Sequence, residues 1–341
     1  MPLLARYIGR RLWLTSFTLV GVVIVVFILT HLLPGNPAAL RAGPLADEAL
    51  IAQYEAEMGL DQPLPVQFIN YAGLLLQGDL GESWRTGQPV LEELGRRLPA
   101  TLELAASAFL LALLIGSSLG ILAAVFVDTW LDHAVRVFAT LGASLALFWL
   151  ALVGVQVFYY TLSWAPPPLD RLTIGVPEPP SVTGLFTIDS LLAGNWATFV
   201  DAISHLWLPA LTLAFVVSAP ITKTMRAAML DALGADFVRT ARAIGVPAHR
   251  LILVDALHNA FIPVLTTLGI VFGYLIAGNV IIERVFSWAG IGQYAWNGLI
   301  TKDFNAVQGF VLLIGLTYVL LNLGIDLLYG VVDPRIRLGK R

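Results

Sequence analysis

Residues 12–33 read LWLTSFTLVGVVIVVFILTHLL, and this stretch contains no Asp, Glu, Lys or Arg. A helix of roughly 20 apolar residues is long enough to cross the hydrocarbon core of a bilayer. Five more uncharged runs follow along the chain: Leu104–Val127, Val137–Trp164, Leu206–Thr222, Asn259–Ile282 and Phe304–Ile325. Each run is predicted to be a helix, because backbone groups in lipid must find their hydrogen-bond partners within the protein. The pattern therefore predicts an all-α multi-pass membrane protein with six transmembrane helices.

The composition points the same way. Of the 341 residues, 57% are hydrophobic and 13% are charged, whereas soluble domains carry about 25% charged residues. One water-soluble core cannot hold this much apolar surface without exposing large patches. These values argue against a soluble enzyme, a disordered protein and a nucleic-acid binder. The net charge of −3 is too small to indicate a partner, and the absence of cysteine excludes disulfides and thiolate metal sites.

The first run also has one feature of a signal peptide, because Arg6, Arg10 and Arg11 precede it. However, its apolar stretch exceeds the roughly 7–15 residues of a signal core, and Leu32–Gly35 is not a small-residue cleavage site. We therefore expect a retained transmembrane helix.

The distribution of Lys and Arg predicts the orientation in the membrane. With the N-terminus in the cytoplasm, the outer segments contain only Arg41, Arg85, Arg96, Arg97, Arg171, Arg284 and Lys302. The other 13 of the 20 Lys and Arg residues lie in the shorter inner segments. Both termini are therefore predicted to be cytoplasmic.

This topology divides the chain into four parts: the cytoplasmic N-terminus and first transmembrane helix (1–33), an extracytoplasmic segment (34–98), the transmembrane core (99–333) and a cytoplasmic tail (334–341). The core includes an extracytoplasmic insertion at about 165–204 and a cytoplasmic loop at about 223–258. Leu98–Leu102 and Leu208–Thr212 each contain a proline that we expect in the first turn of a helix.

The outer segments differ in character. The first is acidic and contains helix-like stretches at Asp47–Met58 and Leu64–Leu76. The second opens with three prolines, Pro166–Pro168, which favour extended backbone and turns. The third, 283–303, is rich in aromatic residues, and Trp and Tyr favour the interfacial zone. It is therefore predicted to lie on the outer membrane surface.

The inner loop at about 223–258 has a pattern of its own. Asp236 is a residue type that caps helix starts, and Gly245 followed by Pro247 is typical of a helix end. Apolar residues recur between them at helical spacing and form one face: Leu233, Phe237, Ala241 and Ile244. Such a short helix suits docking into a groove of a soluble partner. It equally suits an amphipathic helix held on the inner leaflet by its arginines.

Residues 236–245 read DFVRTARAIG and resemble the "EAA" loop of ABC-importer permeases, in the variant of the dipeptide and oligopeptide group. In the general pattern a Glu-Ala-Ala triplet is followed after three residues by Gly. Here Arg239, Thr240 and Ala241 stand at the triplet and Gly245 at the glycine, so only the second alanine and the glycine match. Other segments that resemble these permeases are Gly59–Leu64, Gln77–Gly87, Leu257–Pro263, Glu283–Gly292 and Asp333–Arg337. Residues 164–202 make a longer segment than the shortest members have.

The resemblance implies a type I ABC importer architecture, with this chain as a permease subunit in the bacterial inner membrane. It implies di- or oligopeptides as cargo, delivered by an extracytoplasmic binding protein. It also implies a second homologous permease subunit and two cytoplasmic ATPase subunits that bind ATP and Mg. The residues expected to couple this chain to an ATPase are Asp236, Phe237, Arg239, Thr240, Ala241, Arg242, Ile244 and Gly245. Nickel, glutathione and oligosaccharides are alternative cargoes, because similar permeases serve them.

The chain itself is expected not to bind or hydrolyse ATP, because the sequence has no phosphate-binding glycine-lysine loop. As a permease subunit it is expected to be no enzyme and to hold no cofactor. No metal site is expected, because the five histidines form no metal-binding arrangement with carboxylates at i,i+4. A stand-alone secondary transporter would have ionisable residues within the spans, and these runs have almost none. An intramembrane enzyme would need a catalytic pair at depth, and the runs contain no such pair.

Two features of the second run have more than one interpretation. Glu103 directly precedes the run, so it is either a helix-start carboxylate favoured by the helix dipole or a polar residue at the mouth of the translocation pathway. Gly116 and Gly120 form a small-xxx-small pair, which favours close helix packing over the alternative role of lining the translocation path.

Overall fold

The computed structural model describes residues 2–32, 36–43 and 46–332. The helices are α1 (Pro2–Leu32), α2 (Pro37–Ala42), α3 (Glu48–Glu57), α4 (Leu64–Leu76), α5 (Val90–Val125), α6 (Trp130–Ser144), α7 (Leu147–Gly154), α8 (Phe186–Leu192), α9 (Trp196–Gly234), α10 (Asp236–Ala243), α11 (Ala248–Arg250), α12 (Leu257–Gly278), α13 (Val280–Val285), α14 (Ile291–Thr301) and α15 (Phe304–Val332). A π-helical turn continues α7 over Val155–Thr161, and another joins α11 to α12 over Leu251–Ala256. Within the described ranges, strand-type pairing is limited to one bridge between Glu82 and Pro89. The all-helical prediction is confirmed for this part of the chain.

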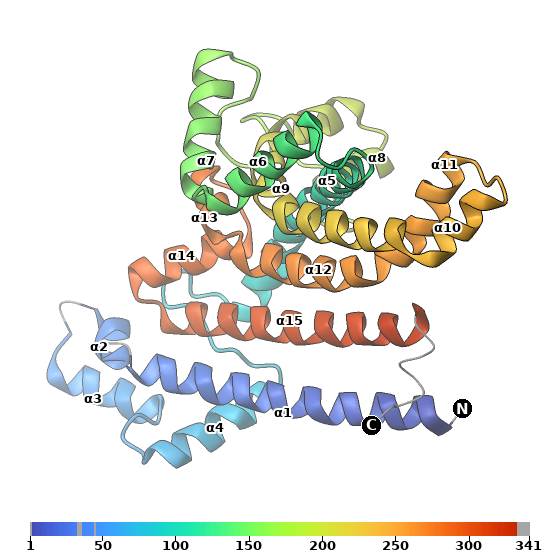
Figure 1. Ribbon diagram of the computed structural model, residues 1–341. Coiled ribbons are helices and arrows are strands. Elements are labelled where there is room, and N and C mark those ends of the chain that lie inside the picture. Colours follow the sequence, from blue (N-terminus) through green and yellow to red (C-terminus); the bar gives the residue numbers. More distant parts are fainter. Residues whose placement is uncertain (1, 33–35, 44–45, 333–341) are drawn as a thin grey trace.

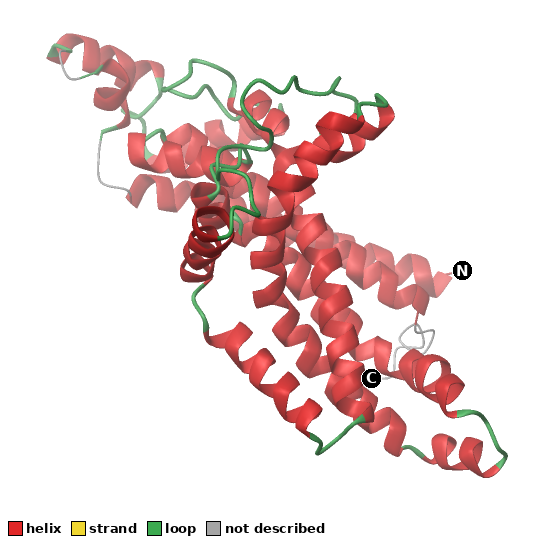
Figure 2. Cartoon of the chain, turned by 90° about the horizontal axis from the view of Figure 1, so that it is seen from above, coloured by secondary structure: helices red, strands yellow, loops and turns green. Residues whose placement is uncertain are grey.

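The helices run between two ends of the molecule (Figure 1). The N-terminal end of α1, the end of α15 and the α10–α11 turn lie together at one end, here called the inner end. The helices α2 and α3 lie at the opposite end of α1, here called the outer end, with α13 and α14 on the same side. Figure 2, seen from above, shows the same separation. In this view the α10–α11 turn therefore lies at the opposite end from α2, α3, α13 and α14.

Among the residues that the structure describes, four helical stretches are long and apolar enough to cross a membrane: Val90–Val125, Trp196–Gly234, Ala248–Val285 and Phe304–Gly324. A fifth crossing results if the bent pair α6–α7 counts as one span. In α1, the described apolar part covers Trp13–Ile28, within a continuous helix of 31 residues. The structure thus supports four to five spans by length and composition, where the uncharged runs predict six.

The third uncharged run is not one tilted helix, as its length suggested. Trp130–Ser144 and Leu147–Thr161 meet at an angle of 104°, because Leu145 and Ala146 between them adopt extended backbone angles. α6 packs on α9 at Gly142, where an added Cβ would lie 3.0 Å from the Phe215 carbonyl oxygen. No proline or charge marks this bend, so a search for gaps between charges passes over it.

The predicted helix starts at Pro99 and Pro209 are wrong. α5 begins at Val90 and contains Pro99, and α9 begins at Trp196 and contains Pro209. The extension of α5 carries two i,i+4 ion pairs, Glu92–Arg96 and Glu93–Arg97, which stabilise a helix outside lipid. Gaps between charges therefore mark the apolar part of each helix and not its end.

α5 and α9 form the centre of the core. At Gly116 an added Cβ would lie 2.8 Å from Cβ of Ile221, and at Gly120 it would lie 2.6 Å from Cβ of Met225. Real Cβ atoms do not approach so closely, so only glycine lets the two helices come this near. The expectation that Gly116 and Gly120 serve close packing is confirmed.

The outer segments match the expectations in part. Asp47 caps α3 by accepting a hydrogen bond from the amide of Leu50, and α4 has the predicted bounds Leu64–Leu76. The insertion after residue 164 is irregular up to α8, as its prolines suggested. The third outer segment is different, because Phe286, Trp288 and Tyr294 are buried within the protein. Packing, and not the water–lipid interface, accounts for these three aromatic residues.

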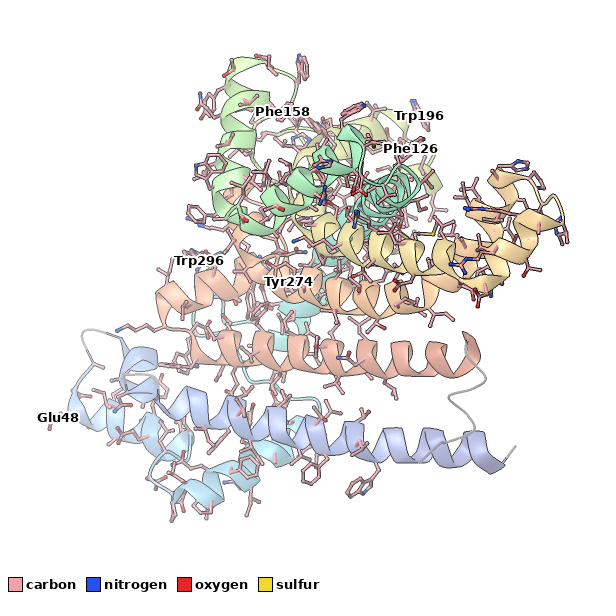
Figure 3. The ribbon with its side chains drawn as sticks, viewed as in Figure 1. Glu48, Phe126, Phe158, Trp196, Tyr274 and Trp296 are labelled. Carbon is pink, nitrogen blue, oxygen red and sulfur yellow. The ribbon has the colours of Figure 1, made fainter. Side chains whose placement is uncertain are left out.

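The outward faces of the helices carry large apolar side chains (Figure 3). Phe126, Trp196 and Tyr274, labelled there, are exposed, as are Trp13 and Phe17 of α1. Exposed apolar surface on this scale is what a lipid environment accommodates. Glu48, by contrast, lies at the outermost part of the outer end (Figure 3).

Candidate functional site

The predicted coupling segment forms a hairpin at the inner end. α10 has eight residues, Asp236–Ala243, and the chain reverses at Gly245, whose φ is +81°. The amide of Val246 donates to the carbonyl of Ala241, and that of Gly245 donates to Arg242. Pro247 then precedes α11, which continues into α12. The expectation of a left-handed glycine after a short helix is confirmed.

The apolar residues of this segment mostly face outward. Val238 is fully buried and anchors α10 against the rest of the chain, whereas Phe237 is 41% exposed and Ile244 is 76% exposed. Thr240 donates its hydroxyl to the carbonyl of Asp236, and Ala241 is half-buried. The predicted face is divided, because Leu233 belongs to α9 and packs against the core, whereas Phe237 and Ala241 lie on α10 and Ile244 follows it. Val238 is the buried residue of α10.

Asp236 does not cap α10, contrary to the prediction. Ala235 occupies the capping position, and Asp236 is the first helical residue, where its charge favours the positive end of the helix dipole. Its carboxylate lies 3.4 Å from a guanidinium nitrogen of Arg239, and both side chains are largely exposed. Arg242 is exposed in the last turn. The hairpin thus presents two arginines beside Phe237 and Ile244.

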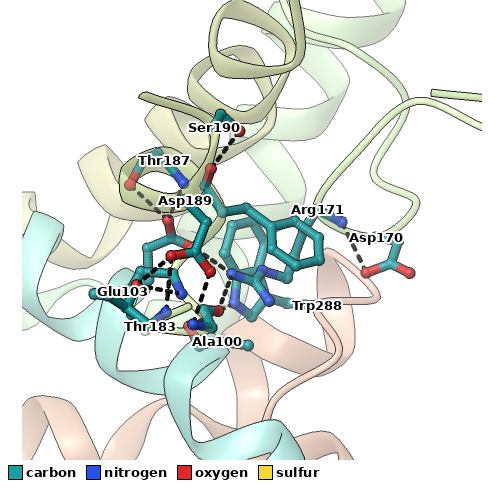
Figure 4. A network of polar contacts seen from close by, with 12 residues as sticks. Ala100, Glu103, Asp170, Arg171, Thr183, Thr187, Asp189, Ser190 and Trp288 are labelled. Atoms are coloured by element: carbon teal, nitrogen blue, oxygen red, sulfur yellow. Dashed lines mark hydrogen bonds and ion pairs between the residues drawn. The ribbon is translucent and has the colours of Figure 1, made fainter. Parts of the chain in front are cut away.

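Glu103 lies in a different site, at the junction between α5 and the outer insertion (Figure 4). It is buried and accepts a hydrogen bond from the guanidinium of Arg171 at 2.5 Å. It also accepts bonds from the amide and hydroxyl of Thr187. The Arg171 guanidinium lies 3.5 Å from the ring centre of Phe186 and 5.8 Å from that of Trp288. Glu103 therefore anchors the insertion to α5.

This arrangement does not match either interpretation of Glu103, as a helix-start carboxylate or as a polar residue at the mouth of the pathway. It is not a helix-start carboxylate, because α5 begins at Val90. Its carboxylate is occupied by Arg171 and Thr187, which leaves little of it to face a pathway. The sequence offered no signal for the pairing, because Glu103 and Arg171 are 68 positions apart.

Asp189 organises the same insertion. Its carboxylate accepts hydrogen bonds from the amides of Val182, Thr183 and Gly184 and from the Thr183 hydroxyl. Burial alone would raise the pKa of this carboxyl, but the four donors outweigh it and hold the pKa below its ordinary value. The insertion is therefore a folded structure and not a loose loop.

A third buried carboxylate, that of Glu283, holds the third outer segment against α5. It accepts hydrogen bonds from the Thr101 hydroxyl at 2.6 Å and from the Gln293 amide at 2.9 Å. Gly290 and Gly292 lie against this carboxylate, where an added Cβ would collide with it. Trp288 donates its ring N–H to the carbonyl of Ala100. Sequence reasoning placed Glu283 in a family motif but missed this contact.

The first outer segment is tied to α15. The Ser83 hydroxyl donates to the carboxylate of Asp303 at 2.5 Å, and Asn305 donates to the carbonyl of Glu82. A cavity of about 940 Å³ lies between α3, α4 and the start of α15. Burial raises the pKa of Tyr71, which lines this cavity, to about 12. The outer end therefore has a hollow with both apolar and polar walls.

Some predicted features lie outside the described residues. They are the tail 334–341, the family segment Asp333–Arg337 and the side chains of Arg6, Arg10 and Arg11.

Comparison with known proteins decides the family. Residues 116–338 match the family described as binding-protein-dependent transport system inner membrane component. Residues 4–105 match the N-terminal region of the membrane component of such systems. The chain belongs to this family. It is therefore a multi-pass inner membrane protein and a permease component, as the resemblance of its inner loop implied.

Relatives of this permease align over almost its whole length. The probable D,D-dipeptide transport system permease protein of Escherichia coli (strain K12) is 48% identical, over 97% of each chain. The di/tripeptide transport system permease protein of Pseudomonas aeruginosa (strain UCBPP-PA14) is 40% identical, over 97% of this chain and 98% of its own. The glutathione transport system permease protein of Salmonella choleraesuis (strain SC-B67) is 37% identical, over 97% of this chain and 99% of its own.

Proposed function

We propose that this chain is the transmembrane permease subunit of an ATP-driven importer of di- or oligopeptides, with α10 and Gly245 as the element that an ATPase moves. The observation that carries the proposal is the pair of exposed apolar side chains, Phe237 on α10 and Ile244 directly after this short helix, whose buried residue is Val238. A soluble partner with an apolar groove would cover both. The two arginines beside them would meet acidic groups at its rim.

The proposed topology has six spans, with both termini in the cytoplasm and 34–98 outside as the first extracytoplasmic segment. The path of the chain supports it. Arg226, about two turns before the end of α9, pairs with Asp132 in the first turn of α6. The end of α9 leads directly into α10 at the inner end. Asp201, near the start of α9, binds Thr173 of the outer insertion. In this topology the bent pair α6–α7 carries the chain from the inner to the outer end.

The partners proposed for this chain are a second homologous permease subunit, two cytoplasmic ATPase subunits and an extracytoplasmic binding protein. ATP and Mg would be bound by the ATPases. ATP-driven closure of the ATPase pair would move α10, and the packed helices would alternate between outward and inward access. Peptide cargo is supported by the D,D-dipeptide and di/tripeptide relatives.

The experiment is uptake by proteoliposomes that contain the complete transporter. A labelled dipeptide supplied with its binding protein should enter only when ATP is inside with the ATPases, and this chain alone should accumulate nothing. Unlabelled dipeptides, including a D,D-dipeptide, should compete. Glutathione is the second candidate, because a glutathione permease is 37% identical. Competition by glutathione, nickel or an oligosaccharide, with none by dipeptides, would refute the peptide cargo.

A matched pair of variants tests the coupling element. Phe237→Ala should weaken ATPase binding about tenfold, because truncating an aromatic anchor in an interface typically costs more than 1 kcal/mol. Phe126→Ala removes the same side chain from the turn after α5, where it is also exposed, and should have no effect on ATPase binding. Equal behaviour of the two variants would remove α10 from the proposed interface.

A further inference from the structure

A small cavity of about 300 Å³ opens between α6 and α9 towards the inner end, away from α10. Its lining includes three cations, Arg136 of α6 and Lys223 and Arg226 of α9. Arg136 directly precedes the uncharged run that begins at Val137, and Lys223 directly follows the run that ends at Thr222. The cations therefore lie where the apolar surface of each helix gives way to polar surface.

The positive charges of this cavity are only partly neutralised. Asp132 is fully buried and accepts two hydrogen bonds from Arg226, at 2.7 and 2.8 Å. The Arg136 guanidinium lies 3.7 Å from the same carboxylate. Asp128 adds a second negative charge near Arg226. Three cations against two carboxylates leave one net positive charge, which is the complement of a single phosphodiester.

Hydrogen-bond donors remain available at the cavity. Arg226 uses two of its five N–H groups on Asp132. Among the described residues, no hydrogen bond is formed by the Arg136 guanidinium, and Lys223 has no acidic partner within ion-pair distance. The Thr140 hydroxyl, in the same lining, donates to the Arg136 carbonyl of its own helix, so the available donors are those of the three cations. Guanidinium and ammonium groups that converge in this way are suited to phosphate oxygens.

The lining of the cavity also contains the apolar residues Val135 and Ala139. On other faces of α6, Trp130 is 79% exposed and Val137 is 59% exposed. Tryptophan favours the level of the lipid headgroups. The cavity therefore lies near the depth of the headgroups, where the phosphate of a membrane phospholipid would enter it while the hydrocarbon chains stay in the bilayer.

We propose that this cavity is a phosphate-binding site that is filled by the headgroup of an anionic phospholipid of the surrounding leaflet. Basic pockets between transmembrane helices are a known way to hold such headgroups. The lipid would bridge α6 and α9 at the Asp132–Arg226 pair and would brace the helix that carries α10. The inference depends on the membrane embedding of the family and not on the identity of the cargo.

The experiment measures lipid binding to the purified full chain in detergent. Short-chain phosphatidylglycerol, short-chain phosphatidylcholine and inorganic phosphate are titrated separately, with bound lipid counted by native mass spectrometry and stability followed by thermal unfolding. Phosphatidylglycerol should bind and raise the unfolding temperature, and phosphatidylcholine should do so less. If inorganic phosphate stabilises the chain as well as phosphatidylglycerol does, the lipid assignment is wrong.

Variants locate the site. Arg136→Gln and Lys223→Gln should each weaken phosphatidylglycerol binding about fivefold, because one cation near an anionic lipid contributes about 1 kcal/mol. Arg250→Gln is the control, since Arg250 is an exposed cation of α11 that lies outside the cavity. Equal affinity in all three variants would overturn the proposal. So would loss of a protein partner, with lipid binding unchanged, when Arg136 and Lys223 are replaced in the assembled transporter.

Discussion

At the scale of single residues, Gly245 is the clearest test of coupling. Its φ of +81° is strained for any residue with a Cβ, although nothing lies within 4 Å of the position that a Cβ would take. A left-handed backbone costs a typical L-residue about 1–2 kcal/mol. Gly245→Val should therefore shift the reversal after α10, and transport and partner-stimulated ATPase activity should fall several-fold while expression persists.

Two companion variants separate backbone strain from side-chain size. Gly234→Val makes the same change at a glycine that also has open space but no positive φ. With this variant, the partner-stimulated ATPase activity should stay near the wild-type value. Gly245→Asn should recover part of the activity, because Asn tolerates left-handed angles. Normal transport by Gly245→Val would contradict the coupling role.

Glu103 supports a prediction about stability. Glu103→Gln leaves the Arg171 guanidinium buried without its carboxylate, and removal of one partner from a buried pair typically costs about 3–5 kcal/mol. The variant should unfold at a lower temperature in detergent, and the segment 165–185 should become sensitive to protease. Glu92→Gln, in an exposed pair with Arg96 on the same helix, should have little effect. Similar unfolding temperatures for both variants would refute the anchoring role.

These residues also show how far sequence can lead. The φ of Gly245 was predictable, because a glycine between a short helix and Pro247 has a purely local cause. The pairs Glu103–Arg171 and Asp132–Arg226 were not, because a pair between distant positions depends on how α5, α6, α9 and the insertion pack. The exposure of Phe237 and Ile244 was also not predictable, because it depends on the burial of Val238 and therefore on how α10 packs against the rest of the protein.

At the scale of helices, the contact of α5 with α9 supports the next prediction. Gly120→Val would place a Cβ 2.6 Å from that of Met225 and 2.9 Å from the Thr222 carbonyl oxygen. Overpacking of this kind costs about 1–3 kcal/mol, so less monodisperse protein should be recovered by size exclusion after extraction in mild detergent. Gly95→Val, on an open face of the same helix, serves as the control. Equal recovery of the two variants would mean that the close contact of α5 with α9 at Gly120 does not stabilise the protein, and the prediction would be wrong.

Helix boundaries were the least predictable feature of the elements. Uncharged runs found the apolar parts of α5, α9, α12 and α15, because transfer of charge into lipid is costly. They missed the outer extension of α5, whose charges are paired along the helix. They also missed the break between α6 and α7, because Leu145 and Ala146, whose backbone is extended there, are as apolar as their neighbours and do not change the hydropathy of the run.

At the scale of the whole molecule, the proposed topology depends on the separation of the inner end from the outer end. α10 and the N-terminal end of α1 lie at the inner end, and the proline-rich insertion is anchored to α5 and α9 by Glu103 and Asp201. The excess of Lys and Arg in the inner loops predicts that this end faces the cytoplasm. Because the chain contains no cysteine, single cysteines can report which side of the membrane each end faces.

Two exposed positions serve this purpose, Ser181 in the outer insertion and Ala243 at the end of α10. In intact cells, a thiol reagent that cannot cross the inner membrane should label Ser181→Cys and leave Ala243→Cys unlabelled until the membrane is opened. A reporter domain that folds only inside the cell should be active when fused after Arg341. Labelling of Ala243→Cys in intact cells would place α10 outside, where no ATP-driven subunit can reach it, and the coupling proposal would fail together with the topology.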